Sequence, residues 1–229
     1  MKIKLFTIIL AAFTLLAGSC KKDEQNIPDE PEPFVITDHF VAGTLTQKSG
    51  TRYTSVFFIR LLEDNKALFI NSSATNLTGT YTLSETELTF EVTGGNARIA
   101  RFTLDKDKKI TSAYYKALNT EYDATGEMLP VGETNQLAGK SFRGEEFKMG
   151  GVSNKPVMIY SFNNGATNSY GSGFDTNGID NTLNTYTLIG GAGFKYVSGN
   201  NVELGFVSGK RLTVFRSAGL YYYGKYDQL

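Results

Sequence analysis

The residues best suited to catalysis are scarce in this chain of 229 residues, which contains one His, one Cys and no Trp. A single His excludes a His-rich metal site, and a single Cys excludes a disulfide framework. Nucleophilic catalysis of the Ser-His-Asp kind would have to use His39. Asp38 precedes His39, but neighbouring residues on a strand point to opposite faces, so Asp38 is poorly placed to orient the ring. We therefore expect no catalytic residue, and a surface or edge position for His39.

Carboxylates and glycines offer no better catalytic arrangement. Glu145-Glu146 and Glu85 with Glu87 are paired acids of the kind that glycosidases use, but they stand in polar, turn-flanked segments typical of structural charge. The run Gly190–Gly193 leads into a strand-like segment, so it lacks the helix N-terminus that holds a phosphate. We predict a protein that is not an enzyme and uses no cofactor, with acid–base catalysis by carboxylates alone as the remaining enzymatic alternative.

The segment Asn163–Thr185 is the most distinctive in composition, being rich in Gly, Asn and Thr. Asp175 and Asn177 supply oxygen atoms at close spacing, but the offsets do not match a calcium loop, so we predict no metal site. Tyr170 and Phe174, flanked by amide side chains, could instead stack on a sugar and hydrogen-bond to it. A long mobile hairpin without a ligand is the alternative.

Tyrosines gather near the C-terminal end as Tyr221-Tyr222-Tyr223, followed by Tyr226. Side chains alternate faces along a strand, so Tyr221 and Tyr223 lie on one face, where an exposed aromatic pair can form a contact patch. The absence of Trp weakens a sugar-stacking platform, and tyrosines that line a barrel mouth or a sheet edge are the alternative. The candidate ligand-binding residues are therefore Tyr170, Phe174, Asp175, Asn177, Tyr221 and Tyr223.

These side chains need a scaffold, and from Phe34 onward the dominant sequence pattern has period two. Leu88, Phe90 and Val92 alternate with polar residues, and the run Val202–Phe206 behaves in the same way. Such alternation is typical of antiparallel strands with one face in a core. Turns rich in Gly, Asn and Asp separate the runs. We predict an all-β protein of about fourteen strands, an antiparallel meander that forms a β-barrel or a sandwich.

A faint internal repeat divides this β region. Gly79–Leu83 (GTYTL) matches Asn184–Leu188 (NTYTL), and the features that follow each segment keep their order. This supports duplication, with chance similarity between hairpins as the alternative. We expect a first β-meander repeat over residues 34–125 and a second over residues 137–229, with a joint between Tyr122 and Gln136. Whether the halves form one barrel or two domains stays open.

The N-terminal segment has the layout of a secretory signal. Lys2 and Lys4 precede an almost uninterrupted apolar run, Leu5–Leu16, and the small residues Ala17–Ser19 stand immediately before Cys20. The apolar run is shorter than the roughly 20 residues that a membrane-spanning helix needs. Residues 1–19 are therefore expected to be a signal peptide that is removed.

The segment Ala17–Cys20 resembles the lipobox of bacterial lipoproteins, in the looser form frequent in Bacteroidetes-type bacteria, with Ala17 where the strict form has Leu. The resemblance implies acylation of Cys20, as by palmitate, and a lipid anchor in the outer membrane. An ordinary cleaved signal with a chance Cys is the alternative. Lys21–Glu24 is similar to a signal that sends such lipoproteins to the cell surface, although a plain charged segment would look the same. Residues 20–33, acidic and rich in Pro, are expected to be an extended tether.

The β region carries a second, less specific resemblance. The G-x-Y-x-L pattern of Gly79–Leu83, followed by L-x-F at Leu88–Phe90, resembles small lipocalin-like repeats of Bacteroidetes-type lipoproteins. The resemblance implies antiparallel meanders that curl into a barrel or half-barrel, here as two tandem lipocalin-like halves. It implies nothing about a ligand.

The charge balance and the N-terminal features together set our functional expectation. The 23 basic and 23 acidic residues balance, which argues against nucleic-acid binding. We expect a non-catalytic envelope protein, anchored in the outer membrane through acylated Cys20, that binds an extracellular ligand such as a glycan or a small apolar molecule. The alternative is a structural or assembly lipoprotein that docks another envelope protein through exposed tyrosines or a strand edge. Exposure at the cell surface and exposure to the periplasm both remain open.

Overall fold

A computed structural model describes residues 33–229, apart from residues 51 and 74. The expected signal peptide, the acylation site Cys20 and almost all of the expected tether lie outside the described residues. Residues Val35–Leu229 form one compact unit. Within the described ranges, no helix has both the length and the apolar character needed to cross a membrane.

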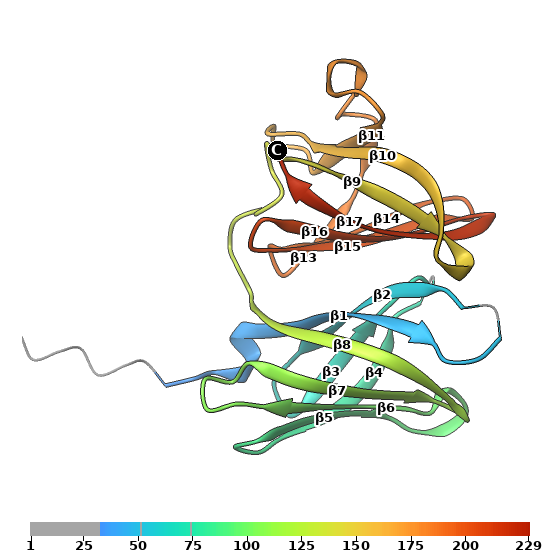
Figure 1. The fold of residues 1–229 in the computed structure, drawn as a ribbon. Helices are drawn as coiled ribbons and strands as arrows, with labels where there is room; N and C mark the ends of the chain where they lie inside the picture. Colours follow the sequence, from blue (N-terminus) through green and yellow to red (C-terminus); the bar gives the residue numbers. More distant parts are fainter. Residues whose placement is uncertain (1–32, 51, 74) are drawn as a thin grey trace, which may run out of the picture. The chain divides into compact units, whose positions relative to one another are not determined.

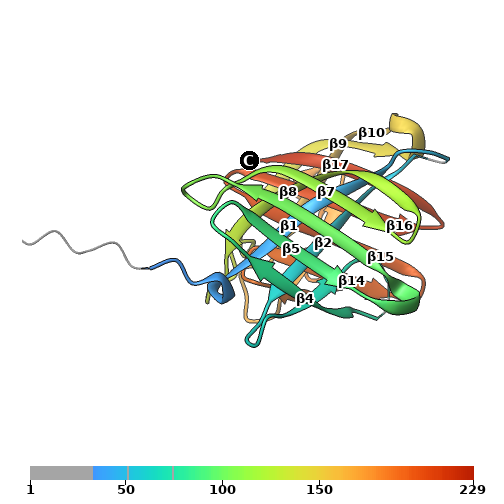
Figure 2. The ribbon, with the colours of Figure 1, turned by 90° about the horizontal axis from the view of Figure 1, so that it is seen from below.

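The first part of the chain forms a closed antiparallel barrel (Figure 1). Its strands are β1 (His39–Gln47), β2 (Thr54–Leu61), β3 (Lys66–Ile70), β4 (Leu77–Leu83), β5 (Glu87–Val92), β6 (Arg98–Leu104), β7 (Ile110–Ala117) and β8 (Thr120–Pro130). Each strand pairs with the next, and β8 returns to pair with β1, where Gly43 stands opposite Gly126. β7 and β8 lie side by side at a common tilt (Figure 2), as the closure of a barrel requires.

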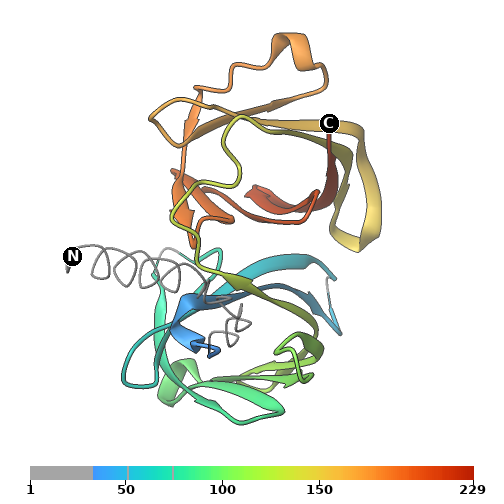
Figure 3. The ribbon, with the colours of Figure 1, turned by 90° about the vertical axis from the view of Figure 1, so that its left-hand side faces the viewer.

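The second part forms a nine-stranded antiparallel sheet that is nearly closed into a barrel, and it curls into a ring in Figure 3. Its strands are β9 (Ser141–Lys148), β10 (Val152–Phe162), β11 (Ser169–Gly173), β12 (Asn184–Thr185), β13 (Thr187–Ile189), β14 (Gly193–Ser198), β15 (Asn201–Ser208), β16 (Arg211–Ala218) and β17 (Leu220–Gln228). β17 pairs with β9, so the two edges of the sheet are β12 and β13. Only Tyr186 separates these two short strands, so the chain itself spans the remaining gap.

Short 3-10 helices join some of the strands in the described ranges. They are η1 (Ile36–Asp38), η2 (Gly94–Asn96), η3 (Met149–Gly151) and η4 (Thr176–Gly178). None is long enough to cover a barrel. The buried core residues lie in strands and, in the second barrel, also between strands, at Leu137, Tyr186 and Ala192.

The predicted all-β antiparallel meander is confirmed, in the form of two barrels. The seventeen described strands exceed the expected number because β12 and β13, of two and three residues, are too short to show a period-two pattern. β8 runs through Gly126 to Pro130, inside the segment expected to be a joint. Gly126 lies within this strand, and glycine there makes room for the core, because a Cβ would lie 2.9 Å from the ring of Phe102.

The two barrels have the same strand order once β12 and β13 are counted as one bent strand. Tyr81 in β4 and Tyr186 at the bend then occupy matching places, as the GTYTL and NTYTL segments suggest. Both tyrosines are buried, at 5% exposure each. The matching strand order supports the duplication inferred from the sequence.

Stacked aromatic rings fill the first barrel. Phe57, Phe69, Phe90, Phe102 and Tyr115 all point inward and are at most 3% exposed. The Phe69 ring lies 5.8 Å from the centroids of three of these rings, those of Phe57, Phe90 and Tyr115. Ring pairs at this spacing are in contact. The centre of this barrel is therefore occupied by its own side chains.

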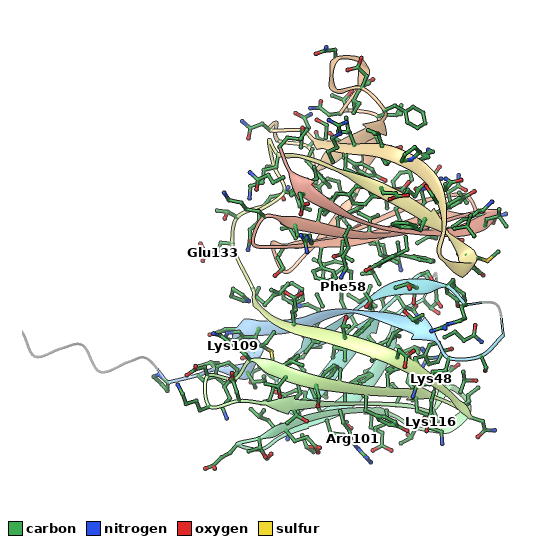
Figure 4. The ribbon with its side chains drawn as sticks, in the orientation of Figure 1. Lys48, Phe58, Arg101, Lys109, Lys116 and Glu133 are labelled. Atoms are coloured by element: carbon green, nitrogen blue, oxygen red, sulfur yellow. The ribbon has the colours of Figure 1, made fainter. Side chains whose placement is uncertain are left out.

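The outer face of β1 and β2 packs against the second barrel. Phe58 of β2 lies on the side next to that barrel (Figure 4), and its ring meets the Phe206 ring edge-on at 6.3 Å between centroids. A Cβ at Gly193 would lie 2.6 Å from the Phe58 ring, and one at Gly190 would collide with the ring of Phe40. The glycine-rich run before β14 is thus explained by aromatic packing.

Candidate functional site

Tyr221 and Tyr223, two of the candidate ligand-binding residues, line a groove of about 420 Å³. Its walls come from the β1–β2 hairpin, the β9–β10 hairpin and the start of β17. The lining residues are Thr46, Arg52, Tyr53, Thr54, Phe147, Lys148, Met149, Gly150, Gly151, Tyr221, Tyr222 and Tyr223. We call this surface the tyrosine groove.

Glycine turns hold the walls of the tyrosine groove in place. Gly150 and Gly151, between β9 and β10, have φ of 80° and 74°, a backbone conformation that favours glycine. The N–H of Gly150 donates to the carbonyl oxygen of Arg52 at 2.8 Å, which ties the β9–β10 turn to the β1–β2 hairpin. Gly219, with φ of 73°, makes the turn that leads into Tyr221. The groove is therefore formed by backbone geometry as well as by side chains.

Aromatic packing orders the floor of the groove. Tyr53 and Tyr221 stack with ring centroids 4.3 Å apart and planes 29° apart. Phe215 lies behind both, with its centroid 6.3 Å from that of Tyr53 and 6.0 Å from that of Tyr221. Tyr221 nevertheless remains 38% exposed. The stacked pair thus leaves a fixed aromatic surface open to solvent.

The polar side chains in the lining of the groove are hydroxyls and cations, and the hydroxyls of Thr46 and Thr54 bond to each other at 2.8 Å. Burial raises the pKa of Tyr53, and it raises the pKa of Tyr223 to about 12, so both hydroxyls stay protonated at neutral pH. The two charged side chains in the lining are cations, Arg52 and Lys148, and both are exposed. Arg52 lies 3.6 Å from Asp123, which is outside the lining.

A buried ion pair lies beneath Tyr222. The ring of Tyr222 covers the guanidinium of Arg216, whose Cζ is 4.2 Å from the ring centroid. Arg216 donates to both carboxylate oxygens of Glu146 at 2.8 to 3.1 Å, and Asn154 donates to the same carboxylate at 2.7 Å. The side chain of Glu146 is 0% exposed and that of Arg216 is 18% exposed. Glu146, expected to be structural charge, is part of this ion pair.

A second buried carboxylate lies in the interior of the same barrel. Glu203 pairs with Arg216 across β15 and β16, so the two side chains point to the same side of the sheet. Glu203 Oε2 and the hydroxyls of Tyr160 and Tyr170 are buried and form no hydrogen bond within the described part of the chain. Burial raises the pKa of the Glu203 carboxyl, and the nearby charge of Arg216 opposes this shift.

Tyr170 lies in the interior of the second barrel and not on a surface. It is 0% exposed, and its ring packs against those of Tyr160, Phe162 and Tyr196 at 5.6 to 5.9 Å. Burial, followed by the charge of Glu203, raises its pKa well above the ordinary value. In this arrangement Tyr170 cannot act together with Tyr221 on one ligand.

The other candidates, Phe174, Asp175 and Asn177, lie on the loop between β11 and β12. Phe174 is 64% exposed, with the Lys155 ammonium 5.0 Å from its ring centroid. Asp175 accepts a hydrogen bond from the N–H of Asn177 at 3.1 Å, which caps η4. In the part of the chain that the structure describes, no three His, Cys, Asp or Glu side chains are grouped to hold a metal. The loop carboxylates stabilise turns.

His39, the only histidine, stands at the start of β1 and is half-buried. Its Nδ1 lies 2.9 Å from the carbonyl oxygen of Val35, which can accept a hydrogen bond from the ring. This contact is part of the turn that leads into the first strand. It gives His39 a structural role at the edge of the barrel.

Among the groove residues not predicted from the sequence are the two cations, Arg52 and Lys148, and the stacking partner of Tyr221, which is Tyr53. All three are far from Tyr221 along the chain. Packing of one barrel on the other brings Arg52 and Tyr53 to the groove, whereas Lys148 stands opposite Tyr222 because β9 pairs with β17. The paired glycines Gly150 and Gly151, which mark a tight turn between two strands, are the one local signal that points to this place.

Comparisons with known proteins add no relative to this description. A scan against protein-family models, a search of curated proteins and a search of solved structures each returned no match.

Proposed function

We propose that this chain is a non-catalytic lipoprotein of the outer membrane that binds an extracellular glycan in the tyrosine groove. The N-terminal layout supports the envelope location, since a signal-like segment ends at Cys20 and an acidic, Pro-rich segment follows. The tether would hold the barrels away from the membrane surface.

The observation that carries the proposal is the exposed aromatic floor of the groove. Sugar rings stack on flat aromatic faces while their hydroxyls form hydrogen bonds around the rim. The stacked Tyr53 and Tyr221 rings supply such a face, and the hydroxyl of Tyr223 and the side chains of Thr46 and Thr54 supply polar groups beside it.

A glycan fits the described residues better than a small apolar molecule does. An apolar ligand would need an empty apolar interior. The first barrel is instead filled by rings in mutual contact, as in the Phe57 and Phe69 pair at 5.8 Å. In the second barrel the interior holds Glu146, Glu203 and Arg216 among tyrosines. The groove, at the surface, suits a polar ligand.

The anchor is tested by replacing Cys20. Cys20→Ser should move the protein from the membrane fraction to a soluble fraction, because acyl chains can no longer be attached. A variant that stays in the membrane fraction would contradict the lipoprotein proposal.

Glycan binding is tested with an oligogalacturonate and its methyl ester as soluble probes, on the full-length Cys20→Ser chain. Tyr221→Ser should weaken binding of both probes about tenfold, because the ring that stacks on the sugar is lost. Tyr114→Ser is the matched control, since Tyr114 lies in β7 of the first barrel and outside the lining of the groove. Loss of affinity in both variants, or binding of neither probe, would contradict the proposal.

Docking of another envelope protein is a second candidate function. Val152 and Leu220, 53% and 46% exposed, start β10 and β17 beside the groove and extend its apolar rim. Leu220→Asp should disrupt a protein contact that is detected by cross-linking in cells, and it should leave the affinity for the sugar probes unchanged. Loss of sugar binding in that variant would assign the rim to the glycan site.

A further inference from the structure

We propose that the tyrosine groove selects acidic glycans, whose sugar rings carry a carboxylate. This inference rests on the proposed glycan-binding function and names the class of sugar. It is argued from the charges and donors that surround the stacked rings.

The lining of the groove combines aromatic rings and cations without a carboxylate. Two other grooves of this unit differ. One is lined by Glu127, Ser208, Lys210, Arg211, Thr213, Lys225 and Asp227, which mixes both signs of charge and includes no ring. The other is lined by Ile70, Asn76, Thr185, Thr187, Ile189, Lys195 and Val197, again without a ring. Among these three grooves, the tyrosine groove is the one whose chemistry complements a ring with a negative charge.

The cations of the groove can bind a ligand at little cost. Lys148 is exposed and forms no ion pair within the described residues. Arg52 lies 3.6 Å from Asp123, and its side chain is 61% exposed, so this contact contributes little and can be exchanged. Asp123 also has a second cation within reach, since Lys48 lies 4.0 Å from it.

The guanidinium of Arg216 in the second barrel does not compete for the ligand. Arg216 is occupied by Glu146 through two-point hydrogen bonding, with the Tyr222 ring above it. A ligand carboxylate would therefore meet Arg52, next to Tyr53, and Lys148, which stands opposite Tyr222 where β9 pairs with β17. The protonated hydroxyls of Tyr53 and Tyr223 can donate further hydrogen bonds. Hydrogen bonds between charged groups are the stronger ones, so charge should decide which sugars bind.

The two probes already named isolate this charge, because methyl esterification of oligogalacturonate removes its carboxylate and keeps its ring. The full-length Cys20→Ser chain should bind the acid about tenfold more tightly than the ester, and less so at high salt. The double variant Arg52→Gln/Lys148→Gln should lose that preference while its affinity for the ester stays unchanged. The double variant Lys210→Gln/Lys225→Gln, in the groove of mixed charge, is the control that also removes two positive charges, and it should keep the preference.

Each outcome separates this inference from the proposed function. Equal affinity for acid and ester overturns the acidic selectivity and leaves glycan binding standing. Loss of the preference in Lys210→Gln/Lys225→Gln also overturns it, because the effect would then come from net charge and not from the tyrosine groove. Binding of neither probe overturns both proposals. A preference that Arg52→Gln/Lys148→Gln abolishes and the charge-matched control keeps supports both proposals.

Discussion

The two barrels share a strand order but are filled in different ways. The first contains a stack of aromatic rings around Phe69. The second contains an ion pair, Glu146 with Arg216, and a further carboxylate, Glu203. It also contains the hydroxyls of Tyr160 and Tyr170, which form no hydrogen bond to any residue that the structure describes. The same backbone topology therefore supports either an apolar or a charged interior.

The contents of the two barrels therefore contribute differently to the stability of the chain and to the candidate site. Apolar burial is the dominant favourable contribution to folding, so the ring stack of the first barrel contributes mainly to stability. A buried ion pair adds little net stability, because desolvation offsets the attraction between the charges. What the pair does provide is a fixed position for Arg216, and with it for the Tyr222 ring in the lining of the groove.

The largest effect is expected from emptying the first barrel. Phe69→Ala should lower the free energy of unfolding by about 3 to 5 kcal/mol, because it removes buried contacts and leaves a cavity. Phe174→Ala is the matched control, since Phe174 is 64% exposed, and it should cost below about 1 kcal/mol. Urea denaturation measures both. Similar losses for the two variants would show that the ring stack is not the main support of this barrel.

A comparable loss is expected from breaking the ion pair of the second barrel. Arg216→Leu should cost about 3 to 5 kcal/mol, because the fully buried carboxylate of Glu146 loses its partner. The double variant Arg216→Leu/Glu146→Leu should recover part of this loss, since Glu146 then leaves no unpaired charge and only the buried carboxyl of Glu203 has lost its nearby guanidinium. A double variant as unstable as the single one would mean that the pair itself stabilises the barrel, against the comparison drawn above.

A smaller effect, which depends on pH, is expected at Glu203. Its pKa is raised by burial, and the charge of Arg216 opposes this shift while the charge of Glu146 reinforces it. The protonated form therefore contributes stability that is fully present below the unfolded pKa of about 4.3 and is lost as pH rises through the folded pKa. The stability of the unaltered chain relative to Glu203→Gln should therefore fall as pH rises from about 4.

Urea denaturation of both chains between about pH 4 and 8 measures this difference. Glu91→Gln is the control, since Glu91 is an exposed residue of the first barrel, and its difference from the unaltered chain should not change with pH in this way. If the unaltered chain instead gained stability relative to Glu203→Gln as pH rises, the carboxylate would be stabilised in its charged form.

The smallest effect is expected at the contact between the buried pair and the groove. Tyr222→Leu should cost about 0.5 to 1 kcal/mol, because the ring that covers the Arg216 guanidinium is lost. Tyr222→Phe keeps the ring and should be close to neutral. Thermal denaturation of the two variants, side by side, measures the contribution of the ring. Equal stabilities would show that packing, and not the aromatic face, holds Arg216.

Much of the fold was predictable from local pattern. The alternation of Leu88, Phe90 and Val92 predicted a strand with one buried face, and β5 has this burial. The pattern failed where strands were too short, at β12 and β13, or where a glycine inside a strand imitated a turn, as at Gly126. In both places the deciding factor is contact with distant strands.

Less of the candidate site was predictable. The prediction of Tyr221 and Tyr223 came from alternation along one strand, and both residues line the groove. Tyr170 has the same residue type and a similar sequence context, yet it lies in the interior. Tyr53 joins the groove only through packing across the two barrels, which no local pattern in the sequence encodes.

The sequence by itself determined the strand pattern, the turns and the expectation of a lipid anchor, because each depends on residues close together in the chain. Only the tertiary structure decided which face of each strand is inside. In β15 the burial pattern covers both faces, since one face lines the barrel and the other packs against its neighbour. Alternation cannot tell these faces apart. The pairing of Glu146 with Arg216, across 70 positions of sequence, therefore depended on closure of the barrel.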